Sequence, residues 1–190
     1  MFNSGGSLTV ENCTVMGSNG SGLIFLSTAT TLQTLRVSNS YFNHNSTAEG
    51  LDIFAKGSGA ITAAIDRTDF SGNGFAGLYV DGTLGTGAIN VTVTDSVAAN
   101  NAFFGFLVQS STGHSASNLT LTHVLAEGNN FAGISASTGA NATLWLAQST
   151  VTGNAAGFVV SPGDVINTYG DNYFNNNGPS TGLLTPTARL

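Results

Sequence analysis

Three side chains of different chemistry stand 28 residues apart in this chain: Arg67, Asp95 and His123. Asn39 precedes them at the same interval, and Gln148 continues the series at a shorter one. A cation, a carboxylate and an imidazole held together can perform acid–base chemistry on a glycan. In such a site His123 would act as base or acid, Asp95 would orient it, and Arg67 would bind a uronate carboxylate or stabilise an enolate.

The same series also has a purely structural interpretation. Asp66 and Asp69 flank Arg67, so a local ion pair explains the arginine as well as a metal site would. A salt-bridged polar ladder at a solvated bend would use the same residue types. Glycoside hydrolysis needs two carboxylates about 5 to 9.5 Å apart, and Asp66 with Asp95 is one such pair if the residues lie on neighbouring repeats. The chemistry therefore depends on the elements that position these residues.

A glycine recurs with nearly the same period and identifies those elements. Its successive spacings are 28, 27, 28, 28 and 24 residues, and an apolar-x-apolar triplet follows each occurrence. A repeat of this length indicates stacked supersecondary units, each covering the apolar face of its neighbour. The glycines of this series are Gly22, Gly50, Gly77, Gly105, Gly133 and Gly157.

Each repeat contains three short segments that have the alternation of half-buried strands. The first carries apolar pairs such as Leu35 and Val37, and the third is the triplet after the glycine. A turn rich in Asn precedes that glycine, and Asn both tolerates left-handed backbone and can hydrogen-bond along a stack. The second segment contributes one apolar residue per repeat, which we assign to Val15, Phe42, Phe70, Val97, Leu125, Val151 and Phe174.

Three strands per repeat, stacked about 4.8 Å apart, predict an all-β, single-stranded, right-handed parallel β-helix. We expect about seven rungs over residues 1–178 and a C-terminal tail or cap over residues 179–190. Right-handedness is the usual sense of parallel β crossovers. A leucine-rich repeat has a compatible period, but the helical leucine spacing is missing. A propeller blade needs about 40 residues or more.

Several segments resemble the right-handed parallel β-helix superfamily that includes the pectate-lyase-like proteins; they read DFSGNGFAGLYV, AEGNNFAGISA and STVTGNAAGFVV. The end, INTYGDNYFNNNG, is similar to the last rung of a group of secreted bacterial β-helix proteins of unassigned function. The resemblance covers roughly residues 7–178 and implies the fold. Lyases of this superfamily use basic residues and often Ca²⁺ held by several carboxylates. No such cluster is recognisable, so we predict no cofactor or metal unless the protein is a lyase.

Members of that group usually carry N-terminal rungs with a cap, whereas this chain starts at what resembles a mid-solenoid rung. An uncapped rung exposes apolar core and strand edges, which favours pairing with another chain. We therefore expect a homo-oligomer formed through the open N-terminal rung, or a truncation of a longer solenoid.

Composition limits the remaining partners and the location. Only 7% of residues are charged and the net charge is −6, so there is no basic stripe for nucleic acid. No run of about 18 apolar residues exists, so membrane insertion is not expected. A surface of Asn, Ser, Thr and Gly suits a secreted or cell-envelope protein, although residues 1–7 lack the features of an export signal.

Three further side chains are predicted to bind a polysaccharide: Trp145, Tyr79 and Asp52. Trp145 lies between two core leucines and should point outward beside Thr120 and Thr168. An exposed Trp or Tyr offers a flat amphipathic ring to a sugar. Asp52 and Tyr79 fall in the outward column of the third segment, which we read as Ile24, Asp52, Tyr79, Leu107, Ser135 and Val159.

The leading hypothesis is an extracellular or envelope β-helix module that binds polysaccharide or serves a structural role. One alternative is a polysaccharide lyase or glycoside hydrolase that acts through Arg67, Asp95 and His123. Its glycan substrate could be acidic, because Arg67 would bind a carboxylate. Another is a self-assembling surface or adhesion subunit, which follows from the open first rung.

Overall fold

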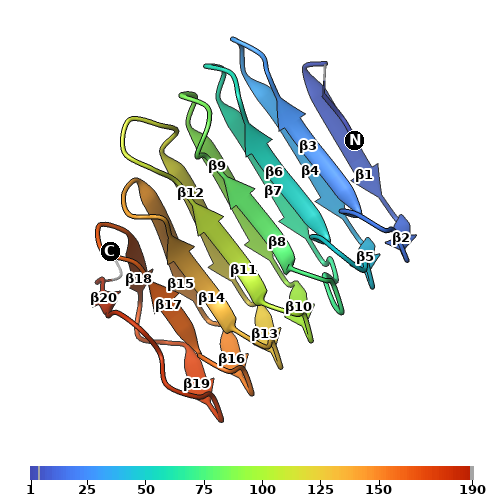
Figure 1. The fold of residues 1–190 in the computed structure, drawn as a ribbon. Coiled ribbons are helices and arrows are strands. Elements are labelled where there is room, and N and C mark those ends of the chain that lie inside the picture. The colour runs from blue at the N-terminus through green and yellow to red at the C-terminus, as the bar shows by residue number, and fades with distance from the viewer. Residues whose placement is uncertain (4, 189–190) are drawn as a thin grey trace.

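The chain folds into a parallel β-solenoid, seen in a computed structural model that describes residues 1–3 and 5–188 (Figure 1). Ser4 and residues 189–190, the end of the expected tail, lie outside the described residues. Every strand pairing in this part of the chain is parallel, and strands of successive turns pair in register, as the 28-residue repeat predicts. The described part has six complete turns and a partial seventh.

Two long sheets and a narrow third side form the solenoid. The eight-stranded sheet contains β1 (Ser7–Glu11), β4 (Gln33–Ser38), β7 (Ile61–Asp66), β9 (Ile89–Thr94), β12 (Ser117–Thr122), β15 (Ala142–Ala147), β18 (Val165–Thr168) and β20 (Leu184–Pro186). The six-stranded sheet contains β3 (Leu23–Ser27), β6 (Leu51–Ala55), β8 (Ala76–Asp81), β11 (Phe104–Gln109), β14 (Ala132–Ser137) and β17 (Phe158–Val160).

The narrow side consists of three-residue strands. They are β2 (Thr14–Met16) and β5 (Tyr41–Asn43), then β10 (Val97–Ala99), β13 (Leu125–Glu127), β16 (Thr150–Thr152) and β19 (Tyr173–Asn175). Asp69 joins the two groups through single bridges to Tyr41 and Val97. Among the described residues, no helix is long and apolar enough to cross a membrane.

The core fills the space between the sheets, because alternate side chains of every strand point inward. Leu35 and Val37 of β4 are buried, as are Phe106 and Val108 of β11. On the narrow side the rings of Phe42 and Phe70 stack with centroids 5.9 Å apart and planes 14° apart. One continuous apolar column thus passes from turn to turn.

In two turns, the buried residue of the second segment is not the one predicted. The structure buries Ala98 and Ala126, whereas Val97 and Leu125 pair with each other one position earlier and are only half-buried. In each of these turns the two adjacent residues, Val97 with Ala98 and Leu125 with Ala126, are both apolar, so period-2 alternation alone does not determine which of them points inward.

The recurring glycines are required by close packing between turns rather than by an unusual backbone angle. A Cβ at Gly50, Gly77 or Gly105 would lie 2.7, 2.8 or 2.5 Å from the carbonyl oxygen of the next glycine in the series. None of these three has a left-handed φ. A side chain at this position would therefore force the turns apart.

Both ends of the solenoid carry chain outside the regular turns. Phe2 pairs with β3: its N–H donates to the Ile24 carbonyl at 2.8 Å, and its ring stacks on Phe25 at 5.1 Å. Leu8 and Val10 of the first turn stay only partly buried. Within residues 179–190, β20 pairs with β18, and Thr181 bridges to Val159. Oligomerisation through the first rung stays a prediction.

Candidate functional site

The residues of the Arg67 series occupy one corner of the solenoid, between the eight-stranded sheet and the narrow side. Each follows the last residue of its strand, and each has a left-handed backbone, with φ of 44° for Arg67, 49° for Asp95 and 53° for His123. Asn39 and Gln148 have the same conformation in their turns, with φ of 47° and 49°. We call this set, Asn39, Arg67, Asp95, His123 and Gln148, the corner column.

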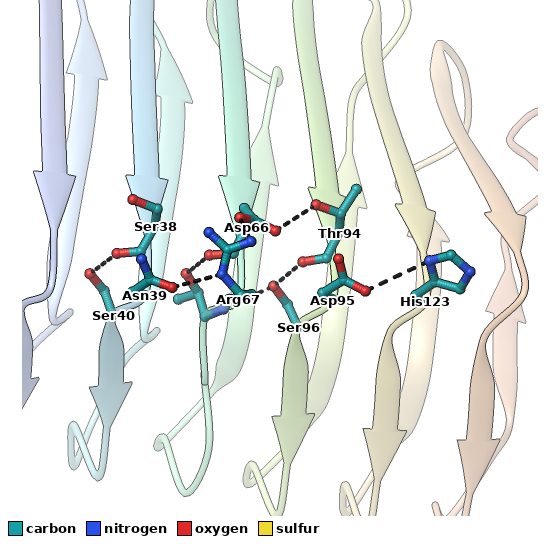
Figure 2. Close-up of polar contacts among 10 residues, drawn as sticks. Ser38, Asn39, Ser40, Asp66, Arg67, Thr94, Asp95, Ser96 and His123 are labelled. Carbon is teal, nitrogen blue, oxygen red and sulfur yellow. Dashed lines mark hydrogen bonds and ion pairs between the residues drawn. The ribbon is translucent and has the colours of Figure 1, made fainter.

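Contacts within the corner column divide it into two groups (Figure 2). Arg67 forms an ion pair with Asp66 at 2.5 Å and donates from Nε to the Asn39 Oδ1 at 2.8 Å. His123 Nδ1 lies 3.7 Å from Asp95 Oδ1. Both groups lie in solvent, since the side chains of Arg67, Asp95 and His123 are 59%, 56% and 53% exposed.

Two hollows beside the corner column separate Arg67 from His123. One, of about 260 Å³, is lined by Arg67 and Asp95 together with Tyr41 and Asp69. The other, of about 520 Å³, is lined by Asp95 and His123 and extends toward Gln148. Asp95 stands between the two, so the predicted acid–base trio lies along one line but does not converge in one hollow.

A row of buried hydroxyl groups supports the corner and escaped the sequence analysis. Ser96 Oγ donates to the Thr94 carbonyl at 2.6 Å and accepts the Thr68 N–H at 3.1 Å, so it ties its own turn to the preceding one. Ser40 makes the equivalent pair of bonds to Ser38 and Cys13. In the sequence, a Ser or Thr directly follows most corner-column residues, and this pattern could have revealed the row of hydroxyl groups.

Asn side chains form a ladder at the bend after the narrow side, buried as far as Asn154 and half-buried at Asn177, as the sequence led us to expect for stacked Asn. In each step an Nδ2 donates to the Oδ1 of the following turn, at 2.9 Å from Asn45 to Asn73 and at 2.9 Å from Asn101 to Asn129. The same oxygens accept backbone N–H groups, as Asn101 Oδ1 does from Asn73 at 2.9 Å. The members of this Asn ladder are Asn45, Asn73, Asn101, Asn129, Asn154 and Asn177.

Asp52 and Tyr79 lie side by side on the outer face of the six-stranded sheet. Strand register reproduces the predicted column, with Asp52 opposite Tyr79 and Tyr79 opposite Leu107. Burial, with smaller contributions from Glu49 and Asp81, raises the pKa of Asp52 to about 8. Its Oδ1 is buried and has no hydrogen-bond partner among the described residues. Asp52 is therefore largely protonated at neutral pH, because desolvation penalises its charged form.

A hydrogen-bonded row begins at Tyr79 and crosses three turns. The Tyr79 hydroxyl donates to Gln109 Oε1 at 2.5 Å, and Gln109 Nε2 donates to Ser137 Oγ at 3.0 Å. Burial, followed by the charge of Asp81, raises the pKa of Tyr79 above its ordinary value, so its hydroxyl remains a donor. We call Tyr79, Gln109 and Ser137 the polar row.

Aromatic rings border the same face where its strands begin, and the sequence analysis missed them. Phe75, Phe103 and Phe131 are 28 residues apart, a spacing that would have revealed them. Phe103 is 47% exposed and Phe131 is 46% exposed. Phe75 contacts both Phe103 and Tyr79, with ring centroids 5.5 and 6.0 Å apart. We call Phe75, Phe103 and Phe131 the aromatic row.

Trp145 lies on a different face from Tyr79 and Asp52. It belongs to β15 and points away from the core, on the outer side of the eight-stranded sheet. Its neighbours across the strands are Thr120 and Asn167, not Thr168 as predicted, because the shorter repeat shifts Thr168 opposite Leu146. Tyr169 stacks on Trp145 with centroids 6.2 Å apart. The core separates Trp145 from the two other predicted sugar-binding residues.

Within residues 1–3 and 5–188, no three His, Cys, Asp or Glu side chains are grouped closely enough to hold a metal ion. The acidic groups nearest Asp52 are Glu49 and Asp81, and each is engaged elsewhere. Ser21 donates to Glu49 Oε2 at 2.7 Å, and the Thr83 N–H donates to Asp81 Oδ1 at 2.8 Å.

Comparison with known proteins agrees with this architecture. A family model described as a right handed beta helix region matches residues 1–156. Searches among curated proteins and among solved structures return no match. Because the family model covers most of the chain, and the structure shows the stacked parallel turns that it describes, the protein belongs to the right-handed β-helix family.

Proposed function

We propose that this β-helix is a polysaccharide-binding module of the cell exterior or envelope, with its binding surface on the outer face of the six-stranded sheet. The observation that carries the proposal is the pairing of two rows on that face. The polar row offers hydroxyl and amide groups, and the aromatic row offers exposed rings next to it.

Sugars present both kinds of surface at once. Their C–H groups pack on aromatic rings, and their hydroxyl groups need hydrogen-bond partners that replace water. Tyr79 joins the two requirements, since its ring contacts Phe75 and its hydroxyl heads the polar row. Asp52 beside it, protonated at neutral pH, can both donate and accept a hydrogen bond without adding charge.

A panel of soluble glycans in affinity electrophoresis and titration calorimetry tests the proposal. The unmodified chain should bind at least one glycan, and Tyr79→Ala should raise its Kd about tenfold or more, equivalent to about 1.4 kcal/mol. Tyr173→Ala is the matched control, since Tyr173 is 71% exposed on β19, on the narrow side of the solenoid. Binding that Tyr79→Ala leaves unchanged would refute the proposed surface, and a panel with no bound member would refute the function.

The catalytic alternative stays a prediction, with the proximity of His123 Nδ1 and Asp95 Oδ1 as its support. A screen of uronate-containing polymers, with and without Ca²⁺, addresses it. Turnover that His123→Ala abolishes would establish a lyase or hydrolase at the corner column. Turnover unaffected by that substitution would remove His123 from the chemistry.

A further inference from the structure

We propose that the polysaccharide is an uncharged, single polymer chain that runs along the solenoid axis across the aromatic row. This inference rests on the proposed function and specifies its ligand. It concerns Phe75, Phe103 and Phe131, which belong to separate turns; Phe75 is the member that contacts Tyr79.

Backbone hydrogen bonds determine the direction of the aromatic row. The Phe103 N–H donates to the Phe75 carbonyl at 3.0 Å, and the Phe131 N–H donates to the Phe103 carbonyl at 2.8 Å. The three residues therefore sit on adjacent turns. With turns about 4.8 Å apart, their positions span roughly 10 Å parallel to the axis. A linear polymer that follows the axis meets one ring per turn, whereas one that crosses the axis meets a single turn.

The angles between the rings favour a single chain over a flat crystalline polymer. Within the aromatic row, the planes of Phe75 and Phe103, which lie on adjacent turns, are 44° apart. A planar crystal surface could lie flat on one of these rings at a time. A separate chain can rotate about its glycosidic bonds and present a sugar face to each ring in turn.

The charge of the face favours an uncharged polymer. Glu49, Asp52 and Asp81 are close enough for the first and last to raise the pKa of Asp52. Lys56 directly follows β6, and its Nζ lies over the Phe54 ring, 5.4 Å from the centroid. With Asp52 protonated, the Glu49 and Asp81 carboxylates still outnumber the Lys56 cation among these described residues, so a polyuronate would meet net repulsion. Sugar hydroxyl groups carry no such penalty.

The experiment compares Phe103→Ala, Phe131→Ala and the double variant with the unmodified chain and with Tyr173→Ala. Both phenylalanines are about half exposed, so truncation should leave the fold intact, which thermal melting followed by circular dichroism checks. The ligands are soluble uncharged glucan, xylan and mannan, oligosaccharides of increasing length, polygalacturonate, and an insoluble crystalline glucan.

The double variant should bind the preferred uncharged polymer at least tenfold more weakly, with each single variant in between. Affinity should rise with oligosaccharide length until the ligand spans the row, and polygalacturonate and the crystalline glucan should bind less well. Sedimentation velocity on the same samples should show one oligomeric state for all variants.

The failures of the two proposals can be told apart. If the unmodified chain binds no glycan, the proposed function fails. If Tyr79→Ala weakens binding but the double variant does not, the function stands and the aromatic row is excluded. Preference for polygalacturonate overturns the charge argument, and preference for the crystalline glucan overturns the single chain. A change of oligomeric state in the double variant would instead assign the row to contact between copies of the chain.

Discussion

The Asn ladder and the corner column are both stacked once per turn, yet they differ in how strictly the residue type repeats. Every member of the ladder is Asn, whereas the corner column contains Asn39, Arg67, Asp95 and His123 in successive turns. Asn73 and Asn101 are 1% and 0% exposed, while the corner side chains of Arg67 and His123 are more than half exposed.

Burial explains the difference. An Asn inside the solenoid must pair both its donor and its acceptor with protein groups. The Asn of the following turn accepts from its Nδ2, and the Asn of the preceding turn donates to its Oδ1. The corner requires only a left-handed backbone, and water solvates whatever side chain stands there. The fold therefore permits different residue types at the exposed corner column, whereas it requires the same residue type at the buried positions of the Asn ladder.

The largest expected effect comes from breaking the ladder with Asn101→Ala. The substitution removes the acceptor of the Asn73 N–H, which stays buried, and one of the two acceptors of Asn73 Nδ2, which keeps its bond to the Phe42 carbonyl. We expect a loss of about 3 kcal/mol in the free energy of unfolding, measured by urea denaturation. Asn130→Ala, one residue after the ladder and exposed, should change it by about 0.5 kcal/mol or less. Equal effects of the two variants would contradict the ladder's importance.

Gly105→Ala should act on the same ladder through its spacing. The new Cβ would lie 2.5 Å from the Gly133 carbonyl oxygen and 2.9 Å from Asn129 Nδ2. Relief requires the turns to separate, at a cost of about 2 kcal/mol. Gly20→Ala is the control, because its Cβ would meet open space. Matching melting temperatures for the two variants would show that the turns yield more easily than their packing indicates.

Asp52→Asn tests a buried oxygen, Asp52 Oδ1, that, unlike the oxygens of the ladder, has no hydrogen-bond partner among the described residues. The pKa of Asp52 is about 8 in the folded chain and near 4 when unfolded. The unmodified protein should therefore lose stability relative to the variant as pH rises from about 4 to 8. One proton limits this change to about 1.4 kcal/mol per pH unit, and partial exposure reduces it. Denaturation curves of both proteins at pH 5 and pH 8 measure how the difference in their free energy of unfolding changes with pH. A difference that does not change with pH would show that the Asp52 carboxyl is solvated in the folded chain.

The smallest effect, and one of opposite sign, is expected at the corner. His123→Gly removes a side chain from a residue with φ of 53°, where glycine has no steric penalty. It also removes a solvent-exposed contact with Asp95 that contributes little. The net change should be a gain of below about 1 kcal/mol. Asn39→Gly should be closer to neutral, since Asn already tolerates this conformation. A clear loss for His123→Gly would show that its side chain is structurally required.

Much of the fold followed from the repeat. The glycine series and the apolar pairs gave the strands of the six-stranded sheet, and those of the eight-stranded sheet as far as β15, in the correct register, and Asp52 was correctly placed opposite Tyr79. Prediction failed where two apolar residues adjoin, as at Val97 and Ala98, because alternation cannot then assign a face. It failed again at Thr168, where a shortened repeat moves the residue opposite Leu146 rather than Trp145.

The candidate site was predicted only in part, because spacing gives the turn and not the direction of a side chain. Arg67, Asp95 and His123 share one corner as predicted. The Arg67 side chain, however, contacts Asp66 and Asn39 rather than Asp95 or His123. The aromatic row was visible in the same 28-residue spacing. Its relation to Tyr79 depends on ring contacts that no spacing reveals.

The sequence by itself determined which residues stack wherever the repeat keeps its length, because equal repeats place equivalent positions one above another. The tertiary structure alone decided which stacks matter for stability and which face collects the polar and aromatic rows. Those properties depend on how far each side chain is withdrawn from water, as the raised pKa of Asp52 and the uniform Asn ladder show. Solvent exposure depends on the packing of distant turns, so the repeat that defines the turns does not encode it directly.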